Sequence, residues 1–297
     1  MVNNGEGRSP GRSAPPEEYD RRYFFSCLGG YKEFRVSAGR KLAPRFRKAM
    51  QLAGVRPGQR VLDIGCGRGE LVIQSALRGA EAVGIDYADV AVRIVEEALA
   101  THPGEVRRRA SALLMDARSM AFDAGCFDTV FMSDIVEHLY PQELAEVLAE
   151  TRRLLKPRGR LVIHTIPNRL FYEVAYPIYI RHVHRTLRRL AELAHYGSYV
   201  IGPMLSVGPQ FPRLPEELRQ HVNEQTAGQL ALTLGESGFR VAKTEHWEIR
   251  DEWPYVSRRL TIELMILDAM RFLRPFSYYW PLNKVFTNHI WAVAEKR

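Results

Sequence analysis

From about residue 60 onwards, short apolar runs alternate with segments in which apolar residues recur every three or four positions. The short runs end at Gly, Pro or Asp and are typical of buried strands, whereas the periodic segments are typical of amphipathic helices. The strands predicted in this way cover residues 60–64, 82–85, 112–115, 127–132, 160–165, 240–248 and 288–294. The helices predicted between them cover residues 70–77, 89–101, 141–155 and 226–237. Strands that alternate with helices predict an α/β fold with a doubly wound, largely parallel sheet.

The part of the chain before residue 54 lacks this alternation. Residues 1–20 are polar and rich in Gly, Pro, Ser and Glu, so we expect a disordered tail there. Residues 21–53 are expected to form an N-terminal helical cap. The cap begins with an aromatic stretch, 23–31, that we expect over a ligand pocket. It continues in a helix over 37–52 whose apolar face packs on the sheet.

The alternation is interrupted again after the strand at 160–165. Residues 169–224 combine tyrosines with a series of arginines. We expect a substrate lid with its own helices here, because structureless loops of this length are uncommon. A second, smaller insertion is expected at 250–284. The sheet domain then consists of residues 54–168 and 225–297.

The chain has 297 residues and a formal net charge of +8. Its basic residues form no dense run, which argues against a nucleic-acid partner. A generally basic surface, an anionic partner and a peripheral membrane contact remain as alternatives. We expect neither a membrane span nor a signal peptide, because no apolar stretch has the required length or position. The spacing of Cys27, Cys66 and Cys126 matches no zinc or CxxC pattern, so a reducing cytoplasm is the expected location.

The predicted strand at 60–64 leads into a turn with glycine at every second position, namely Gly65, Gly67 and Gly69. Such a turn lets a ligand approach the backbone closely, and it lies where parallel α/β sheets bind their ligands. Glu70 opens the next helix, and its carboxylate would repel a pyrophosphate at that helix terminus. A ligand without phosphate groups therefore fits this turn better.

Carboxylates stand at the ends of the first three predicted strands. Asp63 precedes the glycine turn and is expected either to hold the amides of the turn or to meet a ligand ammonium. Asp86 ends the second strand, where a carboxylate can accept both hydroxyls of a ribose; the alternative is a strand-end cap. Asp116 ends the third strand, in a position to receive an adenine amino group, with an ordinary turn residue as the alternative. The set indicates a nucleoside-like ligand.

The segments that carry a family resemblance are VLDIGCGRGE (61–70), VGIDYADVAV (83–92), LMDARSMAF (114–122), FDTVFMSDIVEHL (127–139), LLKPRGRLVIHTIPN (154–168), HVNEQT (221–226) and LGESGF (234–239). They resemble the class I S-adenosylmethionine-dependent methyltransferases, in particular the ubiquinone/menaquinone-type and natural-product members. The resemblance implies a Rossmann-like seven-stranded sheet of order 3-2-1-4-5-7-6 with strand 7 antiparallel. It also implies S-adenosyl-L-methionine as the cofactor and S-adenosyl-L-homocysteine as the product.

The same resemblance assigns residues at the strand ends to the cofactor. Those expected at its methionine end are Asp63, Gly65, Cys66 and Gly67. Those expected at its ribose, at its adenine or elsewhere along the pocket are Asp86, Tyr87, Asp116, Ala117 and Ser133. Arg40, on the N-terminal helix, is a candidate for the cofactor carboxylate, and a solvated or substrate-facing arginine is the alternative.

Transfer of a methyl group from a sulfonium is an in-line displacement, so the protein has to hold the acceptor and exclude water. A hydroxyl acceptor must also lose a proton, which makes a nearby base useful. The candidates are His221, which follows the lid, and His138 and Asp134, which follow the strand at 127–132. For His221 the alternative is a loop histidine bonded to the backbone. His164 lies inside a strand and is expected to be a core histidine.

Asp134, Glu137 and His138 resemble the ExxEH segment with which ubiquinone-type and small-RNA O-methyltransferases hold a divalent metal. Asp replaces the first Glu here, which shortens its reach. A Glu-His pair at this position is also frequent in methyltransferases that bind no metal. We therefore expect no bound metal.

The strand at 127–132 is followed by Ser-Asp-Ile-Val rather than the Asn/Asp-Pro-Pro-Tyr of nucleic-acid amino-methyltransferases, so no nucleic-acid substrate is expected. We expect methyl transfer to a hydroxyl of a small molecule, in secondary or glycan metabolism. The tyrosines and arginines of 169–224 favour an aromatic or anionic acceptor. The alternatives are N- or C-methylation, a polyprenyl or lipid acceptor at a membrane surface, a cofactor-binding protein without transferase activity, and an oxidoreductase that binds NAD. The oligomeric state is left open.

Overall fold

The computed structural model describes residues 13–27, 29–180, 219–246 and 281–297. The greater part of the predicted lid, 181–218, lies outside the described residues, and so does most of the second predicted insertion. Among the residues that are described, no helix is both long and apolar enough to cross a membrane.

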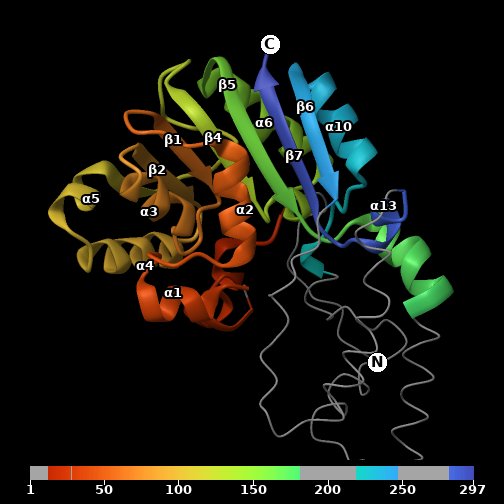
Figure 1. The fold of residues 1–297 in the computed structure, drawn as a ribbon, viewed down its shortest axis with the longest axis horizontal. Helices are drawn as coiled ribbons and strands as arrows, with labels where there is room; N and C mark the ends of the chain where they lie inside the picture. Colours follow the sequence, from red (N-terminus) through yellow and green to blue (C-terminus); the bar gives the residue numbers. More distant parts are fainter. Residues whose placement is uncertain (1–12, 28, 181–218, 247–280) are drawn as a thin grey trace, which may run out of the picture.

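The described strands form one mixed sheet. Their bounds are Arg60–Ile64 (β1), Glu81–Asp86 (β2), Ala110–Leu114 (β3), Phe127–Ser133 (β4), Leu155–Thr165 (β5), Phe239–His246 (β6) and Ile290–Lys296 (β7). The strand order is β3-β2-β1-β4-β5-β7-β6 (Figure 1). β7 runs antiparallel to β5 and β6, whereas the pairs among β1 to β5 are parallel. This topology confirms the sheet expected from the sequence.

Helices cover both faces of the sheet (Figure 1). One face carries α2 (Pro44–Ala53), α3 (Glu70–Leu77) and α4 (Asp89–Ala100). The other carries α6 (Pro141–Leu154) and α10 (Ala227–Glu236). The shorter helical segments are η1 (Pro16–Glu18), η2 (Tyr23–Cys27), α1 (Tyr31–Ser37), α5 (Gly104–Arg109), η3 (Val136–His138), η4 (Phe171–Ile180) and α13 (Asn283–Phe286).

Apolar side chains fill the space on both sides of the sheet. Successive side chains of a strand point to opposite faces, so Val61 of β1 belongs to the cluster under α2 and α3. Its neighbour Leu62 belongs to the cluster under α6 and α10. Because both faces of β1, β4 and β7 are buried, these strands read as largely apolar runs rather than as alternating ones, whereas β3 and β6 at the sheet edges are partly exposed.

The predicted helix over 37–52 begins later than expected. α1 ends at Ser37, the next residues Ala38 and Gly39 have φ angles of +46° and +80°, and α2 begins only at Pro44. Proline is favourable in the first turn of a helix, where its missing N–H has no helical partner to lose. The apolar spacing therefore placed the start of this helix several residues too early.

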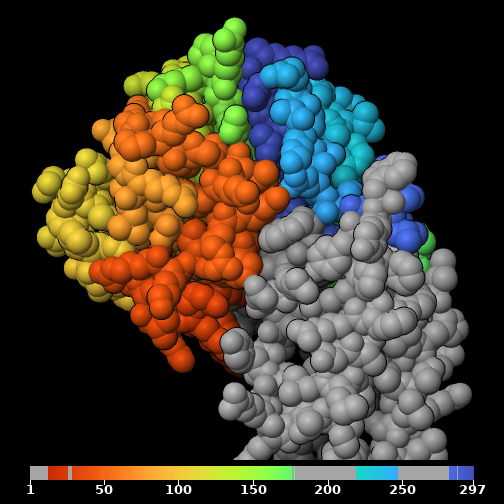
Figure 2. Space-filling view, in the orientation of Figure 1, coloured from red at the N-terminus to blue at the C-terminus, as the bar shows by residue number. Residues whose placement is uncertain are grey.

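Residues 13–20 fall within the stretch that was expected to be disordered, but they are held against the sheet domain. Ser13 Oγ donates to the His138 carbonyl at 2.8 Å, and Tyr87 Oη donates to the Ala14 carbonyl at 2.9 Å. Ala14 and Tyr19 are also buried. Residues 13–20 are therefore ordered, and the rest of the expected tail lies outside the described residues. The space-filling view shows the N-terminal segments, red to orange, packed against the first helices (Figure 2).

The chain order reverses between β1 and β4. β1 pairs with β2 on one side and with β4 on the other, although β4 follows much later in the sequence. In doubly wound sheets a crevice opens at such a switch point, beyond the carboxyl ends of the strands. The functional site is therefore expected at this edge.

Candidate active site

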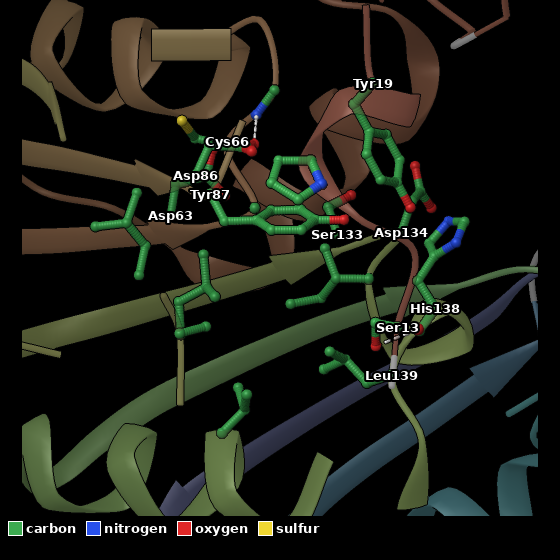
Figure 3. A pocket seen from close by; sticks show the side chains of 18 of the residues that line it. Ser13, Tyr19, Asp63, Cys66, Asp86, Tyr87, Ser133, Asp134, His138 and Leu139 are labelled. Carbon is green, nitrogen blue, oxygen red and sulfur yellow. Dashed lines mark hydrogen bonds between the residues drawn. The ribbon is translucent and has the colours of Figure 1, made fainter. Parts of the chain in front are cut away.

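A cavity of about 370 Å³ lies beyond the carboxyl ends of β1, β2 and β4. Its walls come from the glycine turn, from the loops after β2, β3 and β4, and from N-terminal residues between 13 and 24 (Figure 3). This volume is in the range of pockets that enclose small organic ligands. The predicted cofactor residues that line the cavity are Asp63, Gly65, Cys66, Gly67, Asp86, Tyr87, Asp116, Ala117 and Ser133.

The glycine turn is shaped by left-handed backbone and by close packing. Gly65 and Gly69 have φ angles of +67° and +79°, which L side chains rarely adopt. A Cβ at Gly69 would lie 2.7 Å from a methyl carbon of Val95 on α4, and one at Gly65 would collide with Ile135. The turn consequently stays small and leaves its backbone facing the cavity.

Asp86 ties the end of β2 to the glycine turn. Its carboxylate accepts hydrogen bonds from the Gly67 and Ala88 amides, each at 3.0 Å. Burial raises the pKa of Asp86, and these N–H groups act in the opposite direction. One task considered for Asp63 was to hold the amides of the turn. For the Gly67 amide, Asp86 performs that task.

Asp63 lines the cavity with a buried carboxyl group. Its pKa lies well above the usual range because of burial, with Glu70 and Asp86 as further causes, so its charged form is disfavoured. A positively charged group in the cavity would favour the charged form and lower the pKa of Asp63. A phosphate placed here would disfavour that charged form further.

Glu70 is compensated by Arg68, a residue that the sequence analysis did not single out. Arg68 Nε donates to Glu70 Oε1 at 2.8 Å, and both side chains are almost fully buried. Asp63 and Asp86 therefore disfavour a phosphate ligand more than Glu70 does. Arg68 also donates to the Phe24 and Gly29 carbonyls at 2.6 and 2.7 Å, which ties the N-terminal segment to the glycine turn.

The loop after β3 presents Asp116 together with Arg118. Arg118 Nε lies 3.0 Å from both carboxylate oxygens of Asp116, and the guanidinium holds the pKa of that carboxyl below its usual range. Arg118 Nη1 also donates to Glu143 Oε1 at 3.1 Å. Both Arg118 and Glu143 line the cavity, and neither was predicted. A glutamate on a helix four turns long gives no sequence signal for such a contact.

Arg40 does not line the cavity. Its guanidinium donates instead to the Ser37 and Thr101 carbonyls, next to the end of α4. Arg45, the second residue of α2, does line the cavity, and its Nε lies 3.5 Å from Asp134 Oδ2. The α2 helix therefore supplies an arginine to the site, but from a different position than expected.

The N-terminal segment adds aromatic rings to the cavity wall. Tyr23 and Phe24 line the cavity, as expected for the aromatic stretch at 23–31, and so does Tyr19, which was not predicted. The Tyr19 ring lies edge-on to Tyr23 and to Tyr87, with centroids 4.9 and 5.6 Å apart. The N-terminal segment thus gives the cavity an aromatic wall.

His138 lines the cavity, and His221 lies behind it. Their ring centroids are 5.0 Å apart, and burial lowers the pKa of His138 to about 4. His221 is brought here because the amides of Val222 and Asn223 donate to the Glu137 carbonyl, at 2.9 and 3.1 Å. His221 does not itself line the cavity. The structure thus brings both predicted histidines together but exposes only His138 to the cavity.

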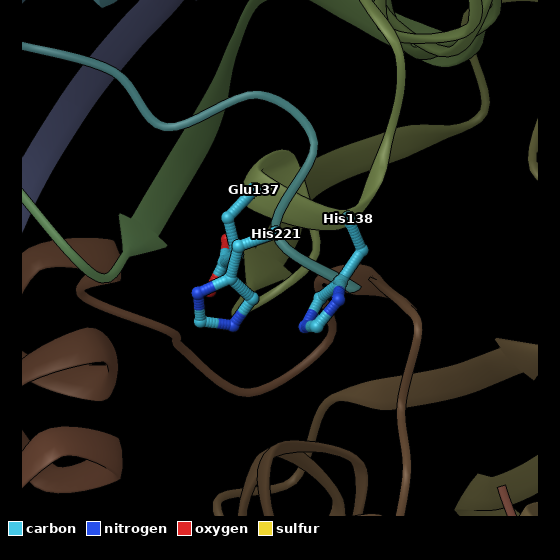
Figure 4. A group of neighbouring side chains, drawn as sticks. All are labelled: Glu137, His138 and His221. Carbon is cyan, nitrogen blue, oxygen red and sulfur yellow. The ribbon is translucent and has the colours of Figure 1, made fainter. Parts of the chain in front are cut away.

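Glu137, His138 and His221 each point one potential ligand atom toward a common space, within 4.8 Å of one another (Figure 4). Two imidazoles and a carboxylate are donors that divalent metals accept. Asp134, the first residue of the metal-binding motif considered above, is not in this group. Its carboxylate is turned to Arg45 and His164. The first carboxylate of that motif is therefore missing from the group, and a metal-free site remains a prediction.

Asp134 is held in an unusual conformation at the end of β4. Its φ angle is +58°, a left-handed conformation that is strained for a residue other than glycine. Its Oδ1 lies 2.5 Å from His164 Nδ1, and its Oδ2 faces Arg45. These two partners hold the pKa of Asp134 far below its usual range despite burial. Of these residues, Asp134 reaches the cavity wall, whereas His164 is buried in the core as expected.

Comparison with known proteins agrees with this geometry. Residues 61–159 match the family model described as a methyltransferase domain. Nocamycin O-methyltransferase from Saccharothrix syringae is 40% identical over 122 residues, which span 40% of this chain and 41% of that protein. A ubiquinone biosynthesis O-methyltransferase from Mesorhizobium japonicum is 28% identical over 213 residues, which span 71% of this chain and 74% of that protein.

Solved structures show the same fold. Geranyl diphosphate C-methyltransferase from Streptomyces coelicolor A3(2), in complex with Mg²⁺, geranyl diphosphate and S-adenosyl-L-homocysteine, has a TM-score of 0.52 to this chain. The identity is 13%, and the match covers 85% of this chain and 77% of that one, so it supports the fold alone. The domain match, the sheet order and the glycine turn agree: residues 61–159 form a methyltransferase domain, and the chain is similar to the class I S-adenosylmethionine-dependent methyltransferases.

Proposed function

We propose that the protein transfers the methyl group of S-adenosylmethionine to a hydroxyl group of a small molecule. The observation that carries this proposal is the arrangement of charge in the cavity. Buried carboxylates gather at the glycine turn, whereas Asp134 and His138 stand at the wall formed after β4. The first group suits a sulfonium and an ammonium, and the second can accept the proton that a hydroxyl must lose.

The residues assigned to the cofactor would act by binding and orientation. Asp86 would accept from the ribose hydroxyls while it keeps the Gly67 amide in place. Asp63 would face the positive end of the cofactor, where burial makes its attraction strong. Tyr87, Asp116 and Ala117 would bound the adenine, as the resemblance implies. When bound, the cofactor supplies an electrophilic methyl group on its sulfonium.

The acceptor would occupy the side of the cavity between the β4 loop and the N-terminal aromatic residues. Tyr19, Tyr23 and Phe24 offer ring faces and edges there, and Arg45 adds a buried cation. A flat ring with a hydroxyl group, in particular one with an anionic substituent, fits these walls. The two curated relatives named above are both called O-methyltransferases, which supports a hydroxyl acceptor.

The test is methyl transfer from cofactor labelled in its methyl group. Catechols, simple phenols, aliphatic alcohols, amines and polyprenylated phenols would be offered separately, and labelled products would be identified by mass spectrometry. Labelling on the oxygen of a phenol or catechol is the expected result. Labelling on amine nitrogen or on carbon alone would show that the hydroxyl assignment is wrong. Tight binding of S-adenosylhomocysteine without turnover of any acceptor would favour a binding protein instead.

The membrane alternative is tested separately. The polyprenylated acceptor would be presented in vesicles of neutral lipid and in vesicles with anionic lipid, and co-sedimentation would be measured with turnover. Equal turnover of a soluble and a vesicle-bound acceptor would argue against a requirement for a membrane surface.

A further inference from the structure

Three polar side chains from distant parts of the chain meet behind the wall of the cavity. Asp134 follows β4, His164 is the next-to-last residue of β5, and His289 precedes β7. The latter two are buried, with 2% and 8% of their surface exposed. Asp134 reaches the cavity (Figure 3). Neither His164 nor His289 has a part in the function proposed above.

The three side chains form a continuous series of contacts. Asp134 Oδ1 lies 2.5 Å from His164 Nδ1, and His164 Nε2 lies 2.9 Å from His289 Nδ1. The rings of His164 and His289 are stacked, with an interplanar angle of 20°, and Trp291 packs on His164 with centroids 4.2 Å apart. The backbones of Asp134 and His164 are also linked, because the Asp134 amide donates to the His164 carbonyl at 3.0 Å. The chain of contacts thus has fixed geometry.

The ionised Asp134 carboxylate determines which ring nitrogens of His164 and His289 carry a proton. An ionised carboxylate only accepts hydrogen bonds, so His164 Nδ1 must carry a proton toward Asp134. In a neutral imidazole the other nitrogen then accepts, which makes His289 Nδ1 the donor to His164 Nε2. Each histidine would then be fixed in one tautomer.

The charged groups around Asp134 come from every element that packs on it. Arg45 of α2 lies 3.5 Å away, His164 belongs to β5, and His289 precedes β7. Glu137 of η3 is the other acid, and burial and Asp134 raise its pKa to about 8, so that it is mostly uncharged at neutral pH. Arg45 therefore balances the one carboxylate that stays ionised.

We propose that His164 and His289 are positioning residues that hold Asp134 ionised at the cavity wall, so that Asp134 takes the proton of the acceptor. This inference rests on the proposed function. The acceptor oxygen forms a bond to the methyl carbon, and the carbon–sulfur bond breaks with its electron pair left on sulfur. The protonated ether that results gives its proton to the Asp134 carboxylate. The products are the methyl ether, neutral S-adenosylhomocysteine and a carboxylic acid, so atoms and charge balance.

A weakly basic carboxylate is adequate for this step. A protonated ether is a far stronger acid than a carboxylic acid, so the proton moves downhill to Asp134 even though Arg45 and His164 stabilise its anion. The advantage of that stabilisation is that Asp134 remains ionised, and ready to accept, across the whole neutral and mildly acidic range. Loss of the His164 contact should therefore bring the acid limit of activity closer to neutral pH.

The first test uses the acceptor found in the labelling experiment and compares two variants of one residue. His164→Asn keeps an amide nitrogen near the place of Nδ1, whereas His164→Gln keeps one near Nε2 and loses the donor to Asp134. We expect His164→Gln to lower kcat roughly 10-fold and to move the acid limb of the pH–kcat profile up by about one unit. His164→Asn should shift the limb less, and His289→Phe should shift it by an intermediate amount.

The control is a histidine with the same burial but another partner. His102 is 4% exposed, and its Nε2 contacts the Ala38 carbonyl at 2.7 Å. His102→Gln should leave the acid limb where it is. Unchanged affinity for S-adenosylhomocysteine would show that each variant is folded. An acid limb that stays in place in His164→Gln would overturn the proposal.

The second test needs no acceptor. Protein labelled with nitrogen-15 in its histidines would be examined by NMR correlation spectra that report ring tautomers. We expect the Nδ1-protonated form for both His164 and His289, and Asp134→Asn should change the His164 signals most. An Nε2-protonated His164 with a bare Nδ1 would overturn the chain. If wild-type protein methylates no hydroxyl, the proposed function fails, and these spectra still decide whether the hydrogen-bonded chain exists.

Discussion

Around β1 and β2 the cavity is built from residues that are near one another in the sequence, whereas around β4 and β5 it is built from residues far apart. Asp86 and the Gly67 amide are separated by 19 positions, and Asp63 lies on the same β-α-β unit. His164 and His289 are separated by 125 positions. The cofactor side therefore depends on a local motif, and the acceptor side depends on how the whole sheet is assembled.

The two sides also differ in the pKa values of their carboxyl groups. At the cofactor side Asp63 and Asp86 are buried with raised pKa values, so a cationic ligand can bind by neutralising them. At the acceptor side the pKa of Asp134 is lowered by Arg45 and His164, so its charge is already balanced within the protein. One side is prepared for a cation, and the other is prepared for a proton.

The largest expected effect is a loss of cofactor affinity when Asp86 is replaced. Asp86→Ala removes the proposed acceptor of both ribose hydroxyls and the partner of the Gly67 amide. Because hydrogen bonds to a charged group contribute about 1.5–3 kcal/mol each, the dissociation constant of S-adenosylhomocysteine should rise about 100-fold or more in isothermal titration. Asp89→Ala is the matched control, since Asp89 is exposed at the start of α4 and pairs with Arg93. Equal binding by the Asp86 variant would contradict the ribose assignment.

A smaller effect is expected on the acceptor side. His221→Ala should reduce kcat about 10-fold while the affinity for S-adenosylhomocysteine stays within about twofold, because His221 packs behind His138 rather than at the cofactor carboxylates. The two quantities would be measured on the same preparation. A loss of cofactor affinity as large as the loss of turnover would show that the two sides are not separable.

Glu137 predicts a pH effect on stability. Burial and Asp134 raise its pKa from 4.5 to about 8, so its contribution to stability is fully present below pH 4.5 and is lost as the pH rises through 8. Glu137→Gln keeps an oxygen for the Thr165 hydroxyl and removes the titration. The melting temperature of the variant relative to wild type should therefore increase by about 2–4 °C between pH 5 and pH 9 in calorimetry. A constant difference would mean that Glu137 is ionised throughout.

Removal of metal ions is expected to have no effect on the reaction rate. Enzyme stripped of metal and assayed in chelator should keep its full rate, because Asp134 is turned away from Glu137, His138 and His221. Activity that disappears in chelator and returns with Mg²⁺ or Zn²⁺ would contradict the metal-free prediction. It would also show that the acceptor side carries a cation after all.

The comparison explains which parts of the site could be predicted from sequence. The glycine turn and Asp86 follow directly from strand ends, and a strand end can be recognised from its apolar run. The Arg68–Glu70 ion pair could not be predicted, because its purpose is to hold the carbonyls of a segment some forty residues earlier. His164 looked like a core histidine, and only the sheet order shows what it contacts.

The fold was predictable for a similar reason, and its departures have local causes. The runs of β1, β4 and β7 are buried on both faces, so their apolar character marks them well. The division between α1 and α2 depends on a left-handed turn at Ala38 and Gly39, which the apolar spacing does not register. The ordering of residues 13–20 depends on Tyr87 and His138, which are distant in sequence, and polar composition alone cannot reveal such anchors.

The position of β7 in the sheet affects the order in which parts of the site can fold during synthesis. β7 is synthesised after β5 and β6, yet it is inserted between them, and it brings His289 to the edge where β4 and β5 end. The glycine turn and Asp86 can form before β7 has been synthesised, because their β-α-β unit is local. The series of contacts that holds Asp134 cannot form until β7 is in place. Long-range strand insertion of this kind is slow relative to local pairing, so a nascent chain would acquire its cofactor cavity before its acceptor chemistry.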